Sequence, residues 1–289
     1  MSRLEQILNL ATRGYAAGRH RILHTSTDES GSVRICCLDK LEARAMDRDV
    51  LYDTLRPLRA VDCSKILQIV GDSATTFSEH ACDILENAID GILHREKADV
   101  LIYGLTGKGE LNEGDVNYVV STWLDADPAD RARFTWGVVT DSGTSYAVKH
   151  GEYTFTENCK NFIVITGDAT FGDEINVTDS ITDVLLVAEG GVQTFSQIVN
   201  VMSRPGTVIY AYDSLRSPDN CRFSAAQFLR YLQQHTDEDS ASRLNLLDDF
   251  CSKLDLLPTH QKDQLEHAWS IFLSHNLFNR LPNIIFNYQ

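Results

Sequence analysis

Six short, almost continuously apolar segments of this sequence alternate with longer stretches of helical periodicity, such as 78–94 and 114–124. Strands that are apolar on nearly every position are typical of a parallel sheet that is covered on both faces. The alternation therefore predicts an α/β fold: a Rossmann-like open parallel sheet with helices on both faces. The six predicted strands span 65–70, 99–103, 135–140, 161–166, 184–187 and 207–212.

The pattern differs at the two ends of the chain and predicts three regions. Residues 1–60 form an N-terminal α/β extension, with helices over 3–18 and 40–58, a polar loop over 25–32 and a strand over 33–38. Residues 61–216 form the Rossmann-like core. Residues 217–289 form a C-terminal helical segment, with helices over 224–235, 239–255 and 260–279. The tail NIIFNYQ is expected to dock on a surface that the sequence does not identify.

The amino-acid composition restricts the classes of partner that this protein can bind. A net charge of −15 and a pI near 4.9 argue against nucleic acid and anionic membranes, because both require a basic surface. No apolar run approaches the length of a membrane-spanning helix. The seven cysteines are irregularly spaced and the nine histidines are scattered, which predicts reduced thiols in a cytoplasmic protein, no metal site and no cofactor.

Four of the predicted strands end in small, polar or glycine-rich turns. In an open parallel sheet, ligands bind outside the carboxyl ends of the strands. We therefore expect a site at this edge, although the P-loop and GxGxxG patterns are both absent from the sequence. The candidate ligand-binding residues of the first three turns are Gly71, Asp72, Ser73, Gly104, Thr106, Gly107, Gly167 and Asp168.

The fourth turn, in the segment VLLVAEGGVQTFSQI, is the most informative. Gly190 and Gly191 stand where a buried strand meets a helix, and Thr194 follows in the first helical turn. Glycines permit a tight turn and a close approach of a ligand to the backbone, and the free N–H groups of a helix start bind anions. The segment therefore predicts a cradle for a phosphate group.

The sequence resembles the LOG family, the lysine-decarboxylase-like Rossmann proteins, and the wider superfamily that includes DprA-like proteins. The resemblance covers about residues 62–215 and rests on YGLTGKGELNEGD and EGGVQTFSQ. It implies a nucleotide 5′-phosphate held by Gly190, Gly191 and Thr194, with Gly104 and Gly107 on the facing wall. It also implies a homodimer.

The chain departs from the family pattern at the positions that carry catalysis. Glu189 replaces the family's proline, Gln193 its third glycine and Gln197 its catalytic glutamate, and 172–183 contains no arginine or lysine. An amide stabilises an oxocarbenium-like transition state less well than a carboxylate. The sequence therefore favours a nucleotide-binding sensor or regulatory module, with Gln193 and Gln197 among its candidate ligand-binding residues. The alternative is a nucleotide N-glycosidase that uses Glu189 or Asp173 as its catalytic carboxylate.

Overall fold

The computed structural model describes residues 21–28, 31–55, 65–71, 77–104, 116–131, 135–140, 159–170, 172–216 and 221–288. The fold is α/β, with a Rossmann-like open parallel sheet flanked by helices, as the sequence predicts. The chain divides into two compact units. The first unit holds Met1–Gln68, Ile92–Glu113 and Asn117–Thr182, and the second holds Ile69–Gly91, Gly114–Val116 and Asp183–Gln289.

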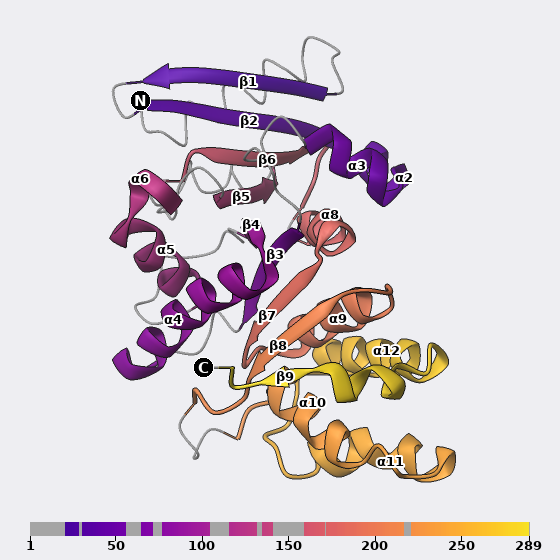
Figure 1. The fold of residues 1–289 in the computed structure, drawn as a ribbon. Coiled ribbons are helices and arrows are strands. Elements are labelled where there is room, and N and C mark those ends of the chain that lie inside the picture. Colours follow the sequence, from indigo (N-terminus) through magenta and orange to yellow (C-terminus); the bar gives the residue numbers. More distant parts are fainter. Residues whose placement is uncertain are drawn as a thin grey trace. The chain divides into compact units, whose positions relative to one another are not determined.

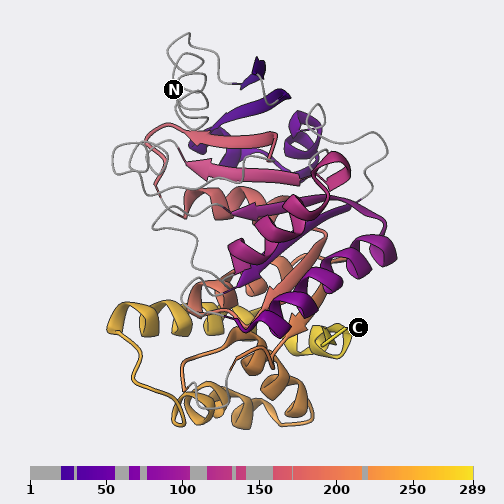
Figure 2. The same ribbon diagram turned by 90° about the vertical axis from the view of Figure 1, so that its left-hand side faces the viewer.

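The first unit contains a mostly parallel sheet. Its strands pair in parallel from β2 through β6 and β5 to β4, and Figure 2 shows β5 and β6 side by side. In sheet order the strands are β1 (Arg21–Asp28), β2 (Gly31–Asp39), β6 (Asn161–Thr166), β5 (Thr135–Thr140), β4 (Ala98–Gly104) and β3 (Lys65–Gly71). The helices are α2 (Lys40–Ala45), α3 (Arg48–Leu55), α5 (Val116–Ala126), α6 (Pro128–Arg131) and α8 (Asp173–Ile181).

The prediction of a polar loop over 25–32 is wrong. Strand β1 runs to Asp28 and pairs antiparallel with β2, which begins at Gly31. Among the described strands β1 lies at the edge of the sheet, and an antiparallel edge strand need not be buried on both faces, so its sequence can be polar. The apolar run that identified the other strands is therefore absent here. Helix α8 was not predicted either, because the stretch 172–183 is rich in polar residues.

The second unit contains the end of β3 and three further strands. In sheet order after β3, these strands are β7 (Val184–Ala188), β8 (Val208–Tyr212) and β9 (Ile285–Phe286). Strand β8 pairs in parallel with both β7 and β9. Figure 1 shows the C-terminal helices of this unit in orange to yellow. The helices that complete the unit are α9 (Val192–Met202), α10 (Ala225–Gln234), α11 (Ser240–Cys251), α12 (Thr259–Ser274) and the 3-10 helix η3 (Leu277–Asn283). Helix α4 (Glu79–Glu96) starts in this unit and ends in the first.

An aromatic cluster holds the helices of the second unit together. Phe195 of α9 lies 5.1 Å from Phe228 of α10 and 6.1 Å from Phe272 of α12, measured between ring centroids. Trp269 stacks on Phe272 at 5.3 Å. These large side chains are almost fully buried, and each such burial contributes about 1.5–3 kcal/mol of transfer free energy. Helices α10 and α12 therefore share one core with β7 and α9.

The C-terminal tail docks on β8, a partner that the sequence did not identify. Asn287 donates its backbone N–H to the carbonyl of Ala211 at 2.9 Å, and its side-chain Nδ2 to Asp213 Oδ1 at 2.9 Å. The hydroxyl of Tyr212 donates to the carbonyl of Tyr288. Asp213, whose side chain is 9% exposed, also accepts from Arg230 Nη2 at 3.1 Å. Asp213 thus links the tail to both β8 and α10.

The compact units differ from the predicted regions 1–60, 61–216 and 217–289. Strand β2 pairs with β6, so the predicted extension is built into the sheet of the first unit. Residues 221–288 pack with β7, α9 and β8 in the second unit. Both differences arise from pairings between distant segments, which local composition does not reveal.

No helix in the described part of the chain is long and apolar enough to cross a membrane.

Replacement of Asp213 by alanine should release the tail. The change removes the acceptor that Arg230 and Asn287 share, and we expect a loss of about 1–3 kcal/mol of unfolding free energy, measured by urea denaturation. Limited proteolysis should then cut the C-terminus of Asp213→Ala faster than that of wild type. Asp249→Ala, on the exposed side of α11, is the control. Equal stability and equal cleavage in all three proteins would contradict this role of Asp213.

Candidate functional site

The turn between β7 and α9 has an unusual backbone. Strand β7 is fully buried and runs directly into Glu189 and Gly190, whose φ angles are 58° and 84°. Gly191 returns to an extended conformation with φ −95° and starts α9. The positive φ explains the glycine at 190, since residues with a Cβ rarely adopt it. Gly191 needs no such freedom, because any residue could adopt its conformation.

The turn is also closely packed against its own helix and the end of β3. A Cβ built on Gly190 would lie 2.4 Å from Thr194 Cγ2, so only glycine fits here. Thr194 in turn places its Oγ1 3.4 Å from the carbonyl oxygen of Gly71, to which it donates. A Cβ on Gly71 would lie 2.8 Å from the carbonyl oxygen of Ala188. The structure therefore brings together three predicted site residues, Gly71, Gly190 and Thr194.

Glu189 is buried inside the unit, with 0% of its surface exposed. Its Oε1 accepts the backbone N–H groups of Leu215 at 2.8 Å and Arg216 at 3.2 Å, and its Oε2 accepts the Ser224 hydroxyl at 2.6 Å. A buried carboxylate requires such donors, because its desolvation is otherwise costly. This geometry gives Glu189 a structural role, and we do not assign it the catalytic role considered from the sequence.

The carbonyl groups of the same turn also accept hydrogen bonds from the first N–H groups of α10. Ala225 donates its N–H to the carbonyl of Gly190 at 2.8 Å, and Ala226 donates to the carbonyl of Glu189 at 2.9 Å. Ser224, the residue before α10, accepts from the backbone N–H of Gln227 while it donates to Glu189. The turn and the start of α10 therefore form one hydrogen-bonded assembly.

The start of α9, by contrast, has neither a capping side chain nor hydrogen-bond acceptors for its first N–H groups among the described residues. Its first intrahelical bond is from the N–H of Phe195 to the carbonyl of Gly191, at 3.1 Å, and no side chain caps the helix. In the described part of the chain, no hydrogen bond uses the N–H groups of Val192, Gln193 or Thr194. Its first turn contains no acidic residue. Free N–H groups and the helix dipole make such a helix start favourable for an anion.

A pocket of about 390 Å³ opens at this helix start, entirely within the second unit. Its wall combines the beginning of α9 with two segments of the C-terminal region, and it carries charged, amide and apolar side chains. The lining residues are Gly191, Val192, Arg222, Phe223, Asp255, Leu256, Leu257, Pro258 and Gln261. None of the last seven was predicted as a site residue, because they lie far from the glycine turn in the sequence.

The two glutamines predicted as ligand contacts have different surroundings. Gln193 is exposed, and its Oε1 accepts a hydrogen bond from Gln264 Nε2 of α12 at 2.5 Å. Gln197, one turn after Thr194, is 9% exposed. Its amide makes no hydrogen bond with another described residue. Gln197 is therefore available for a contact in a way that Gln193 is not.

The turn after β6, in the first unit, is filled by its own side chains. Gly167 has φ 85°, and a Cβ there would lie 2.4 Å from Asp39 Oδ2. The carbonyl of Asp168 accepts from Lys40 Nζ at 2.9 Å. Asp173 accepts the N–H of Thr170 at 2.8 Å and pairs with Arg44 at 2.5 Å. Asp173 thus has a structural role, and we do not assign it the catalytic role considered from the sequence.

Glu174, beside Asp173, is a buried titratable group at the start of α8. It is 3% exposed, and its Oε2 accepts the backbone N–H of Gly172 at 2.9 Å. Burial raises the pKa of its carboxyl group above the usual range, and the negative charge of Asp173 adds to the effect.

Four of the predicted contacts, Asp72, Ser73, Thr106 and Gly107, lie outside the described residues. Gly104 is the last residue of β4.

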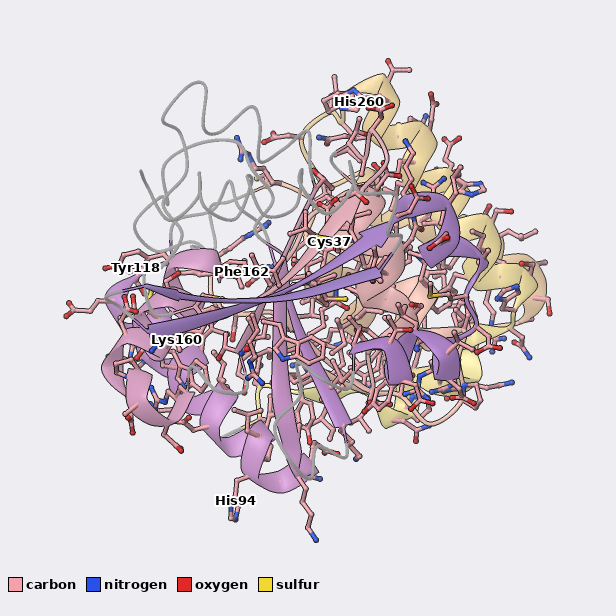
Figure 3. The ribbon with its side chains drawn as sticks, turned by 90° about the horizontal axis from the view of Figure 1, so that it is seen from above. Cys37, His94, Tyr118, Lys160, Phe162 and His260 are labelled. Atoms are coloured by element: carbon pink, nitrogen blue, oxygen red, sulfur yellow. The ribbon has the colours of Figure 1, made fainter. Side chains whose placement is uncertain are left out.

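The scattered histidines and cysteines form no metal cluster among the described residues. His94 of α4 and His260 of α12 are exposed and extend from their helices into solvent (Figure 3). Cys37 is buried on β2, and burial raises the pKa of its thiol to about 11. A thiol with this pKa is protonated at neutral pH and is a poor nucleophile.

No protein-family model matches the sequence, and no curated protein matches it.

Two glycines with nearly equal φ allow the packing of the turn to be tested. Gly206 has φ 81° and nothing within 4 Å of a built Cβ, so Gly206→Ala should cost only the strain, about 1–2 kcal/mol. Gly190→Ala adds the clash with Thr194 and should cost clearly more unfolding free energy in urea denaturation. If the two variants were equally stable, the close packing of Gly190 on Thr194 would be wrong.

Glu189→Gln tests the buried carboxylate. The amide nitrogen cannot accept a hydrogen bond, so one of the donors at Leu215, Arg216 or Ser224 loses its acceptor. We expect a loss of about 1–3 kcal/mol of unfolding free energy. Glu266→Gln, at an exposed position of α12, should change stability by less than about 0.5 kcal/mol. Equal stability of both variants would show that Glu189 does not anchor the turn.

Proposed function

We propose that the second unit binds a nucleotide or a nucleotide-derived phosphorylated molecule at the start of α9, as a sensor or regulatory module. The observation that carries the proposal is the open helix start. The N–H groups of Val192, Gln193 and Thr194 make no hydrogen bond within the described chain, and a pocket opens beside them. A phosphate oxygen is a strong acceptor and suits this arrangement.

The net charge of −15 does not exclude an anionic ligand. Long-range repulsion is screened over about 8 Å at physiological ionic strength, whereas the N–H groups act at contact distance. The first turn of α9 holds no acid that would oppose a phosphate, and Arg222 lines the adjoining pocket. The resemblance to the LOG family points to the same class of ligand through Gly190, Gly191 and Thr194.

The contacts of the two candidate catalytic carboxylates favour a sensor function over hydrolysis, because both side chains already have partners within the protein. The oxygens of Glu189 accept three hydrogen bonds inside the unit, and Asp173 is paired with Arg44. Position 197, where the family carries its catalytic glutamate, is an amide. Cleavage of an N-glycosidic bond requires a group that transfers a proton or stabilises positive charge on the sugar. Release of free base from a bound nucleotide, measured by chromatography, would instead support the N-glycosidase alternative.

Gly191→Ala is the sharpest test of the phosphate cradle. The residue has φ −95° and nothing within 4 Å of a built Cβ, so the variant should fold with wild-type stability. The added methyl group would stand at the pocket wall, where the phosphate approaches the backbone. We expect affinity for a bound nucleotide to fall by about tenfold or more, equivalent to roughly 1.4 kcal/mol.

Isothermal titration calorimetry with AMP, GMP, CMP and UMP measures this change. Urea denaturation of Gly191→Ala confirms that any loss of affinity is not a loss of folding. Equal affinity of wild type and Gly191→Ala would place the ligand elsewhere. If the wild-type protein bound none of the four nucleotides, the proposed function itself would be contradicted.

A further inference from the structure

The tail segment, residues 284–288, lies along β8 in the second unit and adds one more strand to the sheet. Strand β9 pairs in parallel with β8, with Tyr210 opposite Ile285 and Ala211 opposite Phe286. Among the described strands, β9 is the last in the order of the sheet. The tail segment is therefore held in the way that an extended peptide is held when it adds a strand to an open sheet edge.

Side chains of the second unit contact two successive residues of the tail segment. The guanidinium of Arg230 lies over the ring of Phe286, 4.2 Å from its centroid. The side chain of Asn287 accepts the backbone N–H of Asp213 at 3.4 Å and donates to the carboxylate of Asp213 at 2.9 Å. An amide can make both bonds, whereas an ionised carboxylate can only accept. These contacts therefore select a particular sequence in addition to an extended backbone.

The next residue, Tyr288, is held by β8 and by α4. Its ring meets the ring of Tyr210 edge-on, with 5.3 Å between the centroids, and its carbonyl accepts from the hydroxyl of Tyr212. A Cβ built on Gly91 of α4 would lie 3.2 Å from Tyr288 Cε1, so the ring also lies close to this helix. An aromatic ring at this position is therefore contacted from two elements of the unit.

The docking site for the tail segment consists of Gly91, Tyr210, Tyr212, Asp213 and Arg230, and bonds within the unit fix its central carboxylate. Arg230 of α10 donates to Asp213 through Nε and, at 3.1 Å, through Nη2. Gln227, also on α10, donates its side-chain amide to the carbonyl of Asp213 at 3.3 Å. The position of Asp213 therefore does not depend on the tail segment, and the site is formed for any segment of the same sequence.

An exposed connection joins the tail segment to the core. Leu281 of η3 is buried, whereas Pro282 and Asn283 after it are exposed. Ile284 is buried and residues 285–288 are half-buried, so the segment loses few buried contacts when it leaves. The same residues meet the same surroundings in a second copy, and an exchange between copies therefore restores each of these contacts.

We propose that the docking site on β8 accepts the tail segment of a second copy of this chain. Phe286, Asn287 and Tyr288 of each copy then complete the site of the other, and the two copies form a strand-exchanged dimer. An unpaired strand edge is a template for another chain, and the side-chain contacts restrict that chain to the same sequence. The proposal concerns other residues than the start of α9 and does not rest on nucleotide binding there.

Two variants of the whole chain test the exchange when they are mixed. Asn287→Asp disrupts the tail segment, because a carboxylate would face that of Asp213 with no proton to donate. Asn287 has φ 47°, a conformation that aspartate also adopts, so the variant should fold. Asp213→Ala disrupts the docking site and keeps the tail segment intact.

Only the mixture combines an intact segment with an intact site. We expect sedimentation velocity to show a heterodimer in the equimolar mixture, with an association constant at least about tenfold higher than in either variant alone. If Asp213→Ala does not fold, Tyr212→Phe takes its place, since it removes only the hydroxyl that binds the carbonyl of Tyr288.

A labelled synthetic peptide of sequence PNIIFNYQ, residues 282–289, measures docking without dimerisation. Fluorescence anisotropy should show saturable binding of this peptide to the Asn287→Asp protein, whose own segment no longer fills the site. The matched control peptide carries Asn287→Asp and should bind at least about tenfold more weakly, because it lacks the donor to Asp213. The wild-type protein should bind the first peptide more weakly than the Asn287→Asp protein does, because its own segment competes.

Three results would overturn the proposal. If the peptide did not bind the Asn287→Asp protein saturably, the site would not accept a segment from another chain. If the peptide bound but the mixed variants did not associate, the contact would form only within one chain and the exchange would be wrong. If the mixture and both single variants associated equally, the copies would use another surface. None of these results depends on whether the protein binds a nucleotide.

Discussion

The buried carboxylate of Glu189 is the interaction on which the geometry of the second unit depends. It joins the turn after β7 to the N–H groups of Leu215 and Arg216 and to the hydroxyl of Ser224. The carbonyls of Glu189 and Gly190 satisfy the first N–H groups of α10. With the turn fixed in this way, the start of α9 is left without a capping side chain. A buried acid therefore acts here by fixing the turn from which α9 starts.

Two glycine turns of the structure differ in the side chains that surround them. At Gly167, the carboxylate of Asp39 occupies the space that a Cβ would fill, and the start of α8 carries Asp173 and Glu174. At Gly191 the same space is open, and the start of α9 holds no acid. A phosphate would meet repulsion at the first turn and donors at the second. Glycines alone do not separate the two cases, whereas the neighbouring side chains do.

The sequence predicts the parts of this protein that depend on local spacing. The apolar runs located β3 to β8, and the sequence correctly placed Gly190 and Gly191 between a buried strand and a helix. Strand β1 was missed because it is polar, and the partners of Glu189 were missed because they lie 26 to 35 residues away. Arg222 and Asp255 could not be predicted for the same reason. They reach the pocket only because the C-terminal helices share the core of β7 and α9.

The measurement that tests the account most directly is a titration followed by backbone amide NMR, with the signals of 190–195 assigned. AMP should shift the amide signals of Val192, Gln193 and Thr194 more than adenosine does, because the phosphate accepts hydrogen bonds from these N–H groups. Saturable shifts confined to this helix start would agree with a phosphate bound at α9. Amide signals of Val192, Gln193 and Thr194 that did not respond to AMP while other residues shifted would contradict the central claim.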